Sequence, residues 1–190
     1  GKALGAVTSV APIRKTIHDT VTRVYAGTSE SNLYMCQDIF DLENSVELRS
    51  SCHYDGINDI SFLESFDDVF VTCSKSDIRV WNATKLQELL RIQVPNVTCT
   101  SVVIPRDGSL IVSGWDDGKI RAFKPVTGAL EFVINDAHPE GVTAIAVTND
   151  SESIISGGQG GAVRFWSMES RKMIVSLKEH KSPVSSIVVR

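Results

Sequence analysis

The sequence predicts an all-β fold made of four-stranded antiparallel sheets that repeat along the chain. Three observations predict it: similar segments recur every 42 or 43 residues, each repeat holds four short runs rich in Val, Ile, Phe and Thr, and turn residues separate these runs. With 190 residues, 42% of them apolar and 22% charged, the chain can bury a core of ordinary globular composition.

A histidine marks the early part of each unit. His138 and His180 are 42 residues apart, and His53 precedes His138 by 85 residues, which is two periods. An apolar segment typical of a strand follows closely after each of them.

An aromatic residue marks the late part of each unit, in phase with the histidines. Trp81, Phe123 and Trp166 end three copies of one motif and are 42 and 43 residues apart. A period of about 40–45 residues with His early and Trp late is the signature of the WD40 repeat. The chain therefore resembles the WD40 β-propellers, at least over residues 50–190.

The third unit shows how the local sequence favours four strands. Gly108 and the run 116–118 supply turn and hairpin residues, and 110–112 is a continuous apolar run, as expected for a strand buried on both faces. The strands are predicted at 98–104, 110–114, 119–124 and 129–134.

The period divides the chain into about four and a half blades of an incomplete ring, which is expected to have seven blades. In the first unit, the middle strands are predicted at 21–27 and 32–37, with Cys36 in the position of the tryptophan. The predicted divisions are the last strand of a preceding blade at 1–8, blades at 9–50, 51–93, 94–135 and 136–178, and the first strand of a further blade at 179–190.

In WD40 proteins a His, a Ser or Thr, an Asp and a Trp form a buried hydrogen-bonded network, and each unit here departs from it. Gly160 stands at the Asp position of the fourth unit, Asn96 and Phe123 replace His and Trp in the third, and Ser76 lies near the Asp position of the second. Thr72 or Ser74 is the hydroxyl of the second unit. We therefore expect no complete network. The repeat positions are His53, Trp81, Ser113, Asp117, Phe123, His138, Ser156, Trp166 and His180.

Four residues are candidate contacts for a partner. Arg79, Arg121 and Arg164 recur in register, either as a basic ring or, as we favour, as the exposed alternate positions of their strands. Trp115 replaces a small residue near a hairpin turn; it is equally compatible with an exposed anchor and with core packing.

Several functional classes are not expected. One histidine per unit places these side chains in different blades, so they cannot converge on a metal or a catalytic centre. The glycine-rich run 157–161 leads into a strand, not a helix, and is expected to be a hairpin, not a phosphate loop. The four cysteines lack metal or redox spacing and favour a reducing cytoplasm.

The remaining composition argues against other ligands. A net charge of −4 with scattered Lys and Arg does not favour nucleic acid, and no apolar run is long enough to span a membrane. We expect neither a cofactor nor a small-molecule substrate.

Particular segments resemble the cilia- and flagella-associated protein 52 family of double-propeller WD-repeat proteins. These segments are 88–96, 117–123, 134–138, 141–146 and 177–180. The resemblance implies a place in the second propeller, a location in the axoneme of cilia and flagella, and a structural role inside doublet microtubules. It also implies tubulin and neighbouring microtubule inner proteins as partners. The alternative is a general WD40 adaptor, such as a ubiquitin-ligase substrate receptor or a signalling scaffold; an enzyme ranks last.

Overall fold

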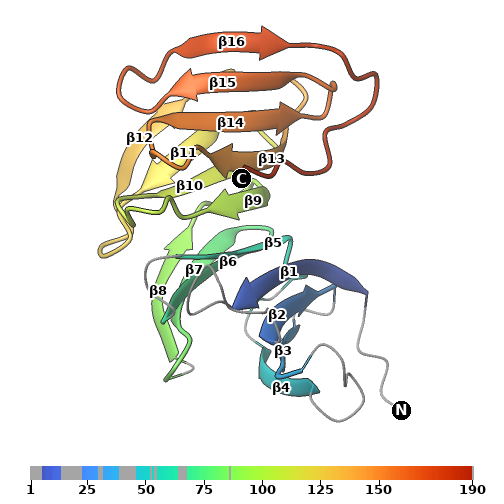
Figure 1. The fold of residues 1–190 in the computed structure, drawn as a ribbon, viewed down its shortest axis with the longest axis vertical. Helices are drawn as coiled ribbons and strands as arrows, with labels where there is room; N and C mark the ends of the chain where they lie inside the picture. Colours follow the sequence, from blue (N-terminus) through green and yellow to red (C-terminus); the bar gives the residue numbers. More distant parts are fainter. Residues whose placement is uncertain are drawn as a thin grey trace.

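The computed structural model of this chain contains four antiparallel sheets (Figure 1). It describes residues 6–13, 23–29, 32–38, 46–51, 53, 55–63, 68–85 and 87–189. Within these residues, the sixteen strands are β1 (Val7–Ile13), β2 (Arg23–Thr28), β3 (Asn32–Cys36), β4 (Val46–Ser51), β5 (Asp59–Phe62), β6 (Val69–Cys73), β7 (Asp77–Asn82), β8 (Gln87–Gln93), β9 (Cys99–Val103), β10 (Ile111–Trp115), β11 (Ile120–Phe123), β12 (Leu130–Ile134), β13 (Val142–Val147), β14 (Ser153–Gly158), β15 (Val163–Ser167) and β16 (Met173–Leu177).

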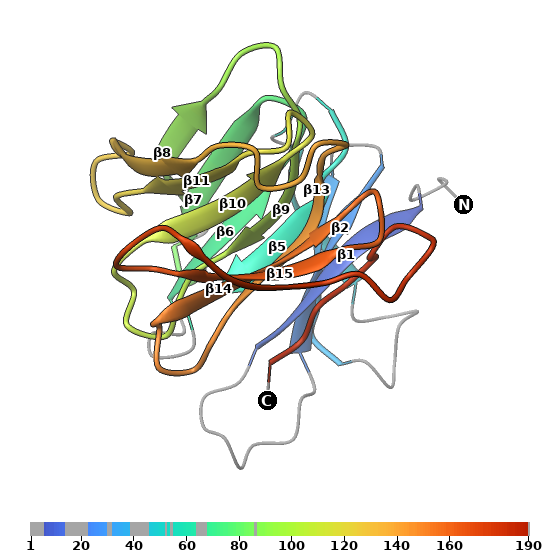
Figure 2. The same ribbon diagram turned by 90° about the horizontal axis from the view of Figure 1, so that it is seen from above.

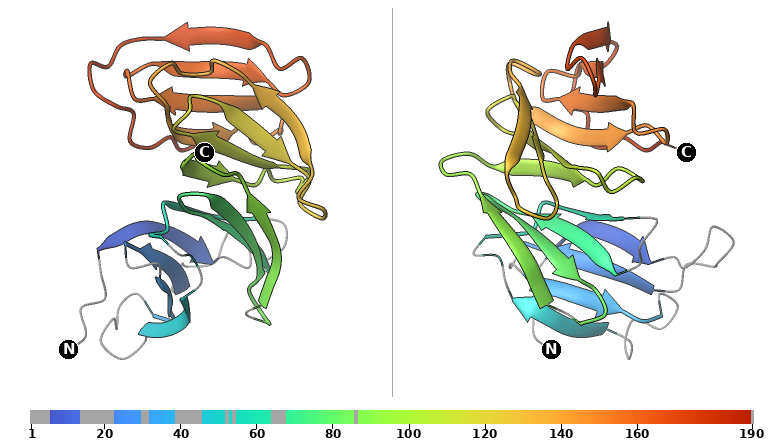
Figure 3. Two further views of the ribbon diagram at one scale, coloured as in Figure 1. Left: turned by 180° about the vertical axis from the view of Figure 1, so that it is seen from behind. Right: turned by 90° about the vertical axis from the view of Figure 1, so that its left-hand side faces the viewer.

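Each sheet is a meander of four consecutive strands, which is the form of a propeller blade. Blade 1 is β1–β4, blade 2 is β5–β8, blade 3 is β9–β12 and blade 4 is β13–β16. The all-β WD40 propeller prediction is confirmed, and the blades follow one another around a common axis (Figures 1 and 3). The predicted strands of blade 3 agree with the observed ones to within one residue at nearly every end.

Turn chemistry explains why the strands of blade 3 end where they do. Gly108 and Gly118 have φ angles of 65° and 77°, a region that glycine adopts without steric cost. Between them, every residue of β10 is buried. This is the two-sided burial that the continuous apolar run predicts.

The first strands of the blades, β1, β5, β9 and β13, lie side by side at the centre (Figure 2). A polar side chain at or just before the start of each strand donates a hydrogen bond to a carbonyl near the start of the next blade. Thr100 Oγ1 donates to the Val142 carbonyl at 2.7 Å, and Asn58 Nδ2 donates to the Cys99 carbonyl at 2.7 Å. Thr8 makes the same bond to Ile57. These bonds fasten each blade to the next at the axis.

Apolar packing fills the space between successive blades. Between blades 2 and 3, the fully buried Trp115 lies in a cluster with Ile111 and Ile78. Between blades 1 and 2, Tyr25 stacks on Phe70 with ring centroids 5.0 Å apart. Burial of apolar surface at about 25 cal/mol per Å² makes these three interblade clusters the main source of stability.

The two ends differ in detail from the predicted divisions. Strand β1 begins at Val7 and pairs with β2, so residues 7 and 8 already belong to blade 1; residues 1–5 lie outside the described part. Residues 184–189 are not assigned to a strand. Even so, the Val184 carbonyl accepts from Thr143 Oγ1 at 2.6 Å, the bond that elsewhere joins one blade to the next. This contact supports a first-strand position for the segment, which stays a prediction.

The outer strand of blade 4 is exposed along its whole length. Every residue of β16 is exposed, including Met173, Ile174, Val175 and Leu177. In blade 3 the equivalent face of β12 is covered by blade 4, where Phe132 and Ile134 are buried. No helix in the described residues is long and apolar enough to cross a membrane.

Candidate functional site

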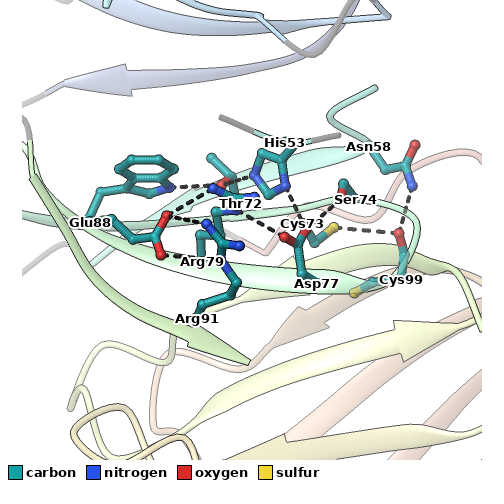
Figure 4. Close-up of polar contacts among 11 residues, drawn as sticks. His53, Asn58, Thr72, Cys73, Ser74, Asp77, Arg79, Glu88, Arg91 and Cys99 are labelled. Atoms are coloured by element: carbon teal, nitrogen blue, oxygen red, sulfur yellow. Dashed lines mark hydrogen bonds and ion pairs between the residues drawn. The ribbon is translucent and has the colours of Figure 1, made fainter. Parts of the chain in front are cut away.

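Blade 2 contains a complete buried network, in contrast to the prediction (Figure 4). Trp81 Nε1 donates to Thr72 Oγ1 at 2.8 Å, and Thr72 Oγ1 lies 2.6 Å from Nε2 of His53. His53 Nδ1 lies 2.7 Å from a carboxylate oxygen of Asp77. These distances are satisfied when the proton of Nδ1 points to the carboxylate and Nε2 accepts from Thr72.

The acid of blade 2 was missed because its hairpin is one residue shorter than the others. From hydroxyl to aromatic there are nine residues in blade 2 and ten in blades 3 and 4, as the spacing of Thr72 and Trp81 shows. Asp77, the first residue of β7, therefore supplies the carboxylate instead of Ser76. Ser74 Oγ also donates to Asp77, at 2.5 Å. The shorter spacing between Thr72 and Trp81 is the feature of the sequence that indicates this shift of the acid.

Asp77 is held ionised by its neighbours. Burial acts to raise the pKa of this carboxyl, but hydrogen bonds from His53 and Ser74 and the charge of Arg79 outweigh it. The pKa of Asp77 is thus well below its usual value. Arg79 extends the network, since its Nε lies 2.9 Å from Asp77 and its Nη1 lies 2.8 Å from Glu88. Glu88 could not be predicted as part of the network, because the equivalent residues in blades 3 and 4 are Leu130 and Met173.

Blade 4 has the network without an acid, as predicted. Ser156 Oγ lies 2.8 Å from Nε2 of His138 and accepts from Trp166 Nε1 at 2.9 Å. Burial and the positive charge of Arg164 lower the pKa of His138 to about 4. The imidazole is therefore neutral at pH 7.

In blade 3, Trp115 occupies the position that histidine has in blade 4. A side chain at Gly158, which is equivalent to Trp115, would meet the ring of His138 at 2.2 Å. Trp115 fills this space itself and donates from Nε1 to Ser113 Oγ at 2.9 Å. Asn96, predicted to replace the histidine, is instead exposed with a φ of 65°. Since Trp115 is fully buried, the core alternative is correct, and the residue is not a surface contact.

The three arginines are neither a basic ring nor simply exposed. Arg79 is buried against two carboxylates, and Arg121 forms two hydrogen bonds with Asp117, at 3.0 and 2.6 Å, while lying 5.1 Å from the ring of Trp115. Arg164 is half-buried and donates to the Ala137 carbonyl at 2.6 Å. The exposed-position interpretation is wrong because Arg79 is buried, and Arg121 and Arg164 are half-buried with hydrogen-bonded guanidinium groups.

The remaining predicted positions keep their places in the repeat. Trp81, Phe123 and Trp166 lie opposite equivalent residues of the preceding strand, two residues before the hydroxyl. Their side chains are buried. His180 is exposed, but its carbonyl lies against Gly161 as the His138 carbonyl lies against Gly118.

A polar belt that the sequence did not indicate joins blades 1, 2 and 3 near the axis. Asp59 accepts from Ser101 Oγ at 2.7 Å, from the Val102 amide at 2.9 Å and from Ser9 Oγ at 3.2 Å. Burial raises its pKa, although these hydrogen bonds act in the opposite direction. The belt lines a cavity of about 540 Å³ between the first strands.

The structure also shows where candidate metal ligands and thiols lie in the described part of the chain. The described residues contain no group of three or more His, Cys, Asp or Glu that could hold a metal ion. Cys36, Cys73 and Cys99 are buried, and burial raises the pKa of the Cys73 thiol well above its usual value. Cys52 and His18 lie outside the described residues.

Known repeats match the same region of the chain. The WD domain, G-beta repeat family matches residues 130–167, which comprise β12 and the first three strands of blade 4. The matched unit is therefore shifted by one strand relative to the sheet, so that each sequence repeat connects two blades. Residues 130–167 therefore belong to the WD40-repeat family, and the four sheets have the form of its β-propeller blades.

The chain is also similar to longer proteins over almost its whole length. It is 45% identical over 188 residues to human cilia- and flagella-associated protein 52, covering 98% of this chain and 29% of that protein. Identity to the Chlamydomonas reinhardtii protein of the same name is 43% over 194 residues, covering 100% of this chain and 30% of the relative. WD repeat-containing protein 90 of Xenopus tropicalis is 26% identical over 92% of this chain and 10% of its own length.

Proposed function

We propose that this chain is part of a non-enzymatic structural scaffold of motile cilia and flagella. The observation that carries the proposal is the 45% identity, over 98% of the chain, to a protein named for its association with cilia and flagella. The geometry supports a scaffold, because the buried histidines of blades 2 and 4 are each bonded within their own sheet. Side chains committed in this way do not converge on a substrate.

In finer terms, we propose a microtubule inner protein that binds tubulin and neighbouring proteins in axonemal doublets. Rigidity supports this role, since blades fastened at the axis and packed along their faces resist bending. The net charge of −4 does not suit the acidic tails of tubulin, which favours contacts on the lumenal side.

The ciliary location is tested by tagging the endogenous protein and imaging it in motile cells. We expect signal along the length of axonemes that remains after the membrane is extracted with detergent. A diffuse cytosolic or nuclear signal would contradict the proposal.

The partners are tested by chemical cross-linking of intact axonemes, followed by identification of the linked peptides. We expect this protein to be cross-linked to tubulin residues that face the lumen of the doublet. We also expect doublets that lack the protein to lose a discrete density in the lumen. Recovery of cullin adaptors in place of tubulin would instead favour the WD40 adaptor function.

A further inference from the structure

Three equivalent arginines differ in how many carboxylates they contact. Arg79, Arg121 and Arg164 each lie opposite the hydroxyl residue of the preceding strand. Arg79 is paired with two carboxylates and Arg121 with one. Within the described residues, Arg164 forms no ion pair, and its Nε is buried without a hydrogen-bond partner.

The sequence of blade 4 explains this difference. Gly160 is equivalent to Asp117, the acid that holds Arg121, and Ala162 is equivalent to Asp77, the acid that holds Arg79. Met173 likewise stands where Glu88 stands in blade 2. Blade 4 has therefore lost all three possible acids while keeping the cation.

A half-buried guanidinium without an acid is less favourable than one that is paired with a carboxylate, as Arg121 is in blade 3. In blade 3, Asp117 accepts from both Nη atoms of Arg121, so a carboxylate at the same place in blade 4 would pair with the Nη atoms of Arg164 and not with its buried Nε. Guanidinium and carboxylate form short, charge-assisted hydrogen bonds with matched geometry. Arg164 can therefore form an ion pair with a carboxylate that comes from outside the blade.

Space for that carboxylate exists beside Gly160. Gln159 and Gly160 are exposed at the tip of the β14–β15 hairpin. A Cβ atom at Gly160 would meet nothing nearer than the carboxylate of Glu140, at 3.5 Å. Position 160 is therefore open to solvent at the place from which Asp117 reaches Arg121 in blade 3.

We propose that Arg164 and the hairpin tip at 159–160 bind an aspartate or glutamate side chain of a partner protein. The partner's carboxylate takes the position that Asp117 takes in blade 3 and pairs with Arg164. The occupant is a protein segment with an exposed acidic side chain, because charge complementarity to one uncompensated cation selects an anion. This inference does not depend on the ciliary role.

Glu140 acts as a competitor within the chain. Its carboxylate lies beside position 160, but it makes no ion pair with Arg164. By its charge it repels an incoming acid and so weakens binding. Neutralising it is expected to strengthen binding of a partner.

The test measures the affinity of the full protein for the peptide acetyl-Gly-Glu-Gly-Glu-Gly-amide, with the glutamine peptide of the same length as the control ligand. We expect binding of the glutamate peptide to weaken about tenfold or more in Arg164→Gln, which loses a charge-assisted pair. We expect the same in Gly160→Asp, which supplies the acid from within the chain. Glu140→Gln should bind more tightly, and Lys178→Gln, which removes an exposed cation elsewhere in blade 4, should bind as the wild type does.

The imidazole of His138 gives a second measurement. Because the charge of Arg164 contributes to lowering its pKa, pairing Arg164 with a carboxylate should raise the pKa of His138 above about 4, both with bound glutamate peptide and in Gly160→Asp. NMR titration of the ring protons measures this shift.

Equal binding of the glutamate and glutamine peptides, or unchanged binding in both Arg164→Gln and Gly160→Asp, would overturn the proposal. If Arg164→Gln does not fold, Gly160→Asp alone decides. Position 160 does not have a positive φ, so aspartate fits the backbone there.

Discussion

Blades 3 and 4 fill the space beside their buried serine with different residues. Blade 4 combines His138 with Gly158, and blade 3 combines Trp115 with a loop that lacks the histidine. In both blades one nitrogen-bearing ring fills the space beside the buried serine. The sequence showed both departures, a bulky residue at a small position and a missing histidine, but only their spatial coincidence explains them.

The role of Trp115 predicts how stability responds to its substitution. Trp115→Phe removes the donor to Ser113 while keeping most of the ring, and should cost about 1–2 kcal/mol. Trp115→Ala leaves a cavity and should cost about 3–5 kcal/mol. Urea unfolding measures both. A surface anchor would instead show unchanged stability and weaker partner binding.

The neutral His138 predicts a loss of stability in mild acid. Its pKa is about 4 in the folded chain and near 6.5 when unfolded, so the unfolded state binds more protons between these values. The stabilisation is therefore present above pH 6.5 and is lost as the pH falls towards 4, by on the order of 3 kcal/mol in total. His138→Gln should lack this component when unfolding free energies at pH 7 and pH 5 are compared. Equal pH dependence in both proteins would contradict the assignment.

At the scale of the element, the space around a glycine shows how closely neighbouring blades approach each other. A Cβ at Gly114 in β10 would lie 2.4 Å from Val142 of the next blade. No atom comes nearer than 3.5 Å at Gly160 in the β14–β15 hairpin. Identical substitutions at these two sites therefore form a matched pair.

We expect Gly114→Ala to destabilise the protein by about 1–3 kcal/mol, because β10 and β13 must separate. Gly160→Ala should be neutral or stabilising by up to about 1 kcal/mol, since it restricts only the unfolded chain. Thermal unfolding of both variants checks the prediction. Similar losses at both positions would show that the blades do not meet as described.

Sequence periodicity predicts elements of this chain well because strands and turns have local causes. The positive φ of Gly108 and Gly118 and the apolar run of β10 are visible as residue types. Pairing across blades has no such local cause. Asp59, which joins three blades, is one acidic residue among many, and the direction of each arginine depends on which acids its own hairpin supplies.

At the scale of the whole molecule, the belt around Asp59 predicts coupling between blades. Its two oxygens accept from the Val102 and Ile60 amides and from two serines. In Asp59→Asn, an NH₂ group must face one of these donors, and we expect a loss of about 1–3 kcal/mol. Hydrogen exchange should show faster opening of β1, β5 and β9 together. Faster exchange confined to β5 would contradict the belt.

The shortened hairpin of blade 2 has a consequence for how divergent propellers are recognised. With one residue fewer between Thr72 and Trp81, the carboxylate lies at the start of β7 and not in the turn, yet His53 Nδ1 is 2.7 Å from it. The hydrogen bond between the histidine and the acid is therefore present, although the acid stands at a different position of the repeat. Searches that score each position independently will undercount intact blades, whereas a search that tolerates a one-residue slip between partners would recover them.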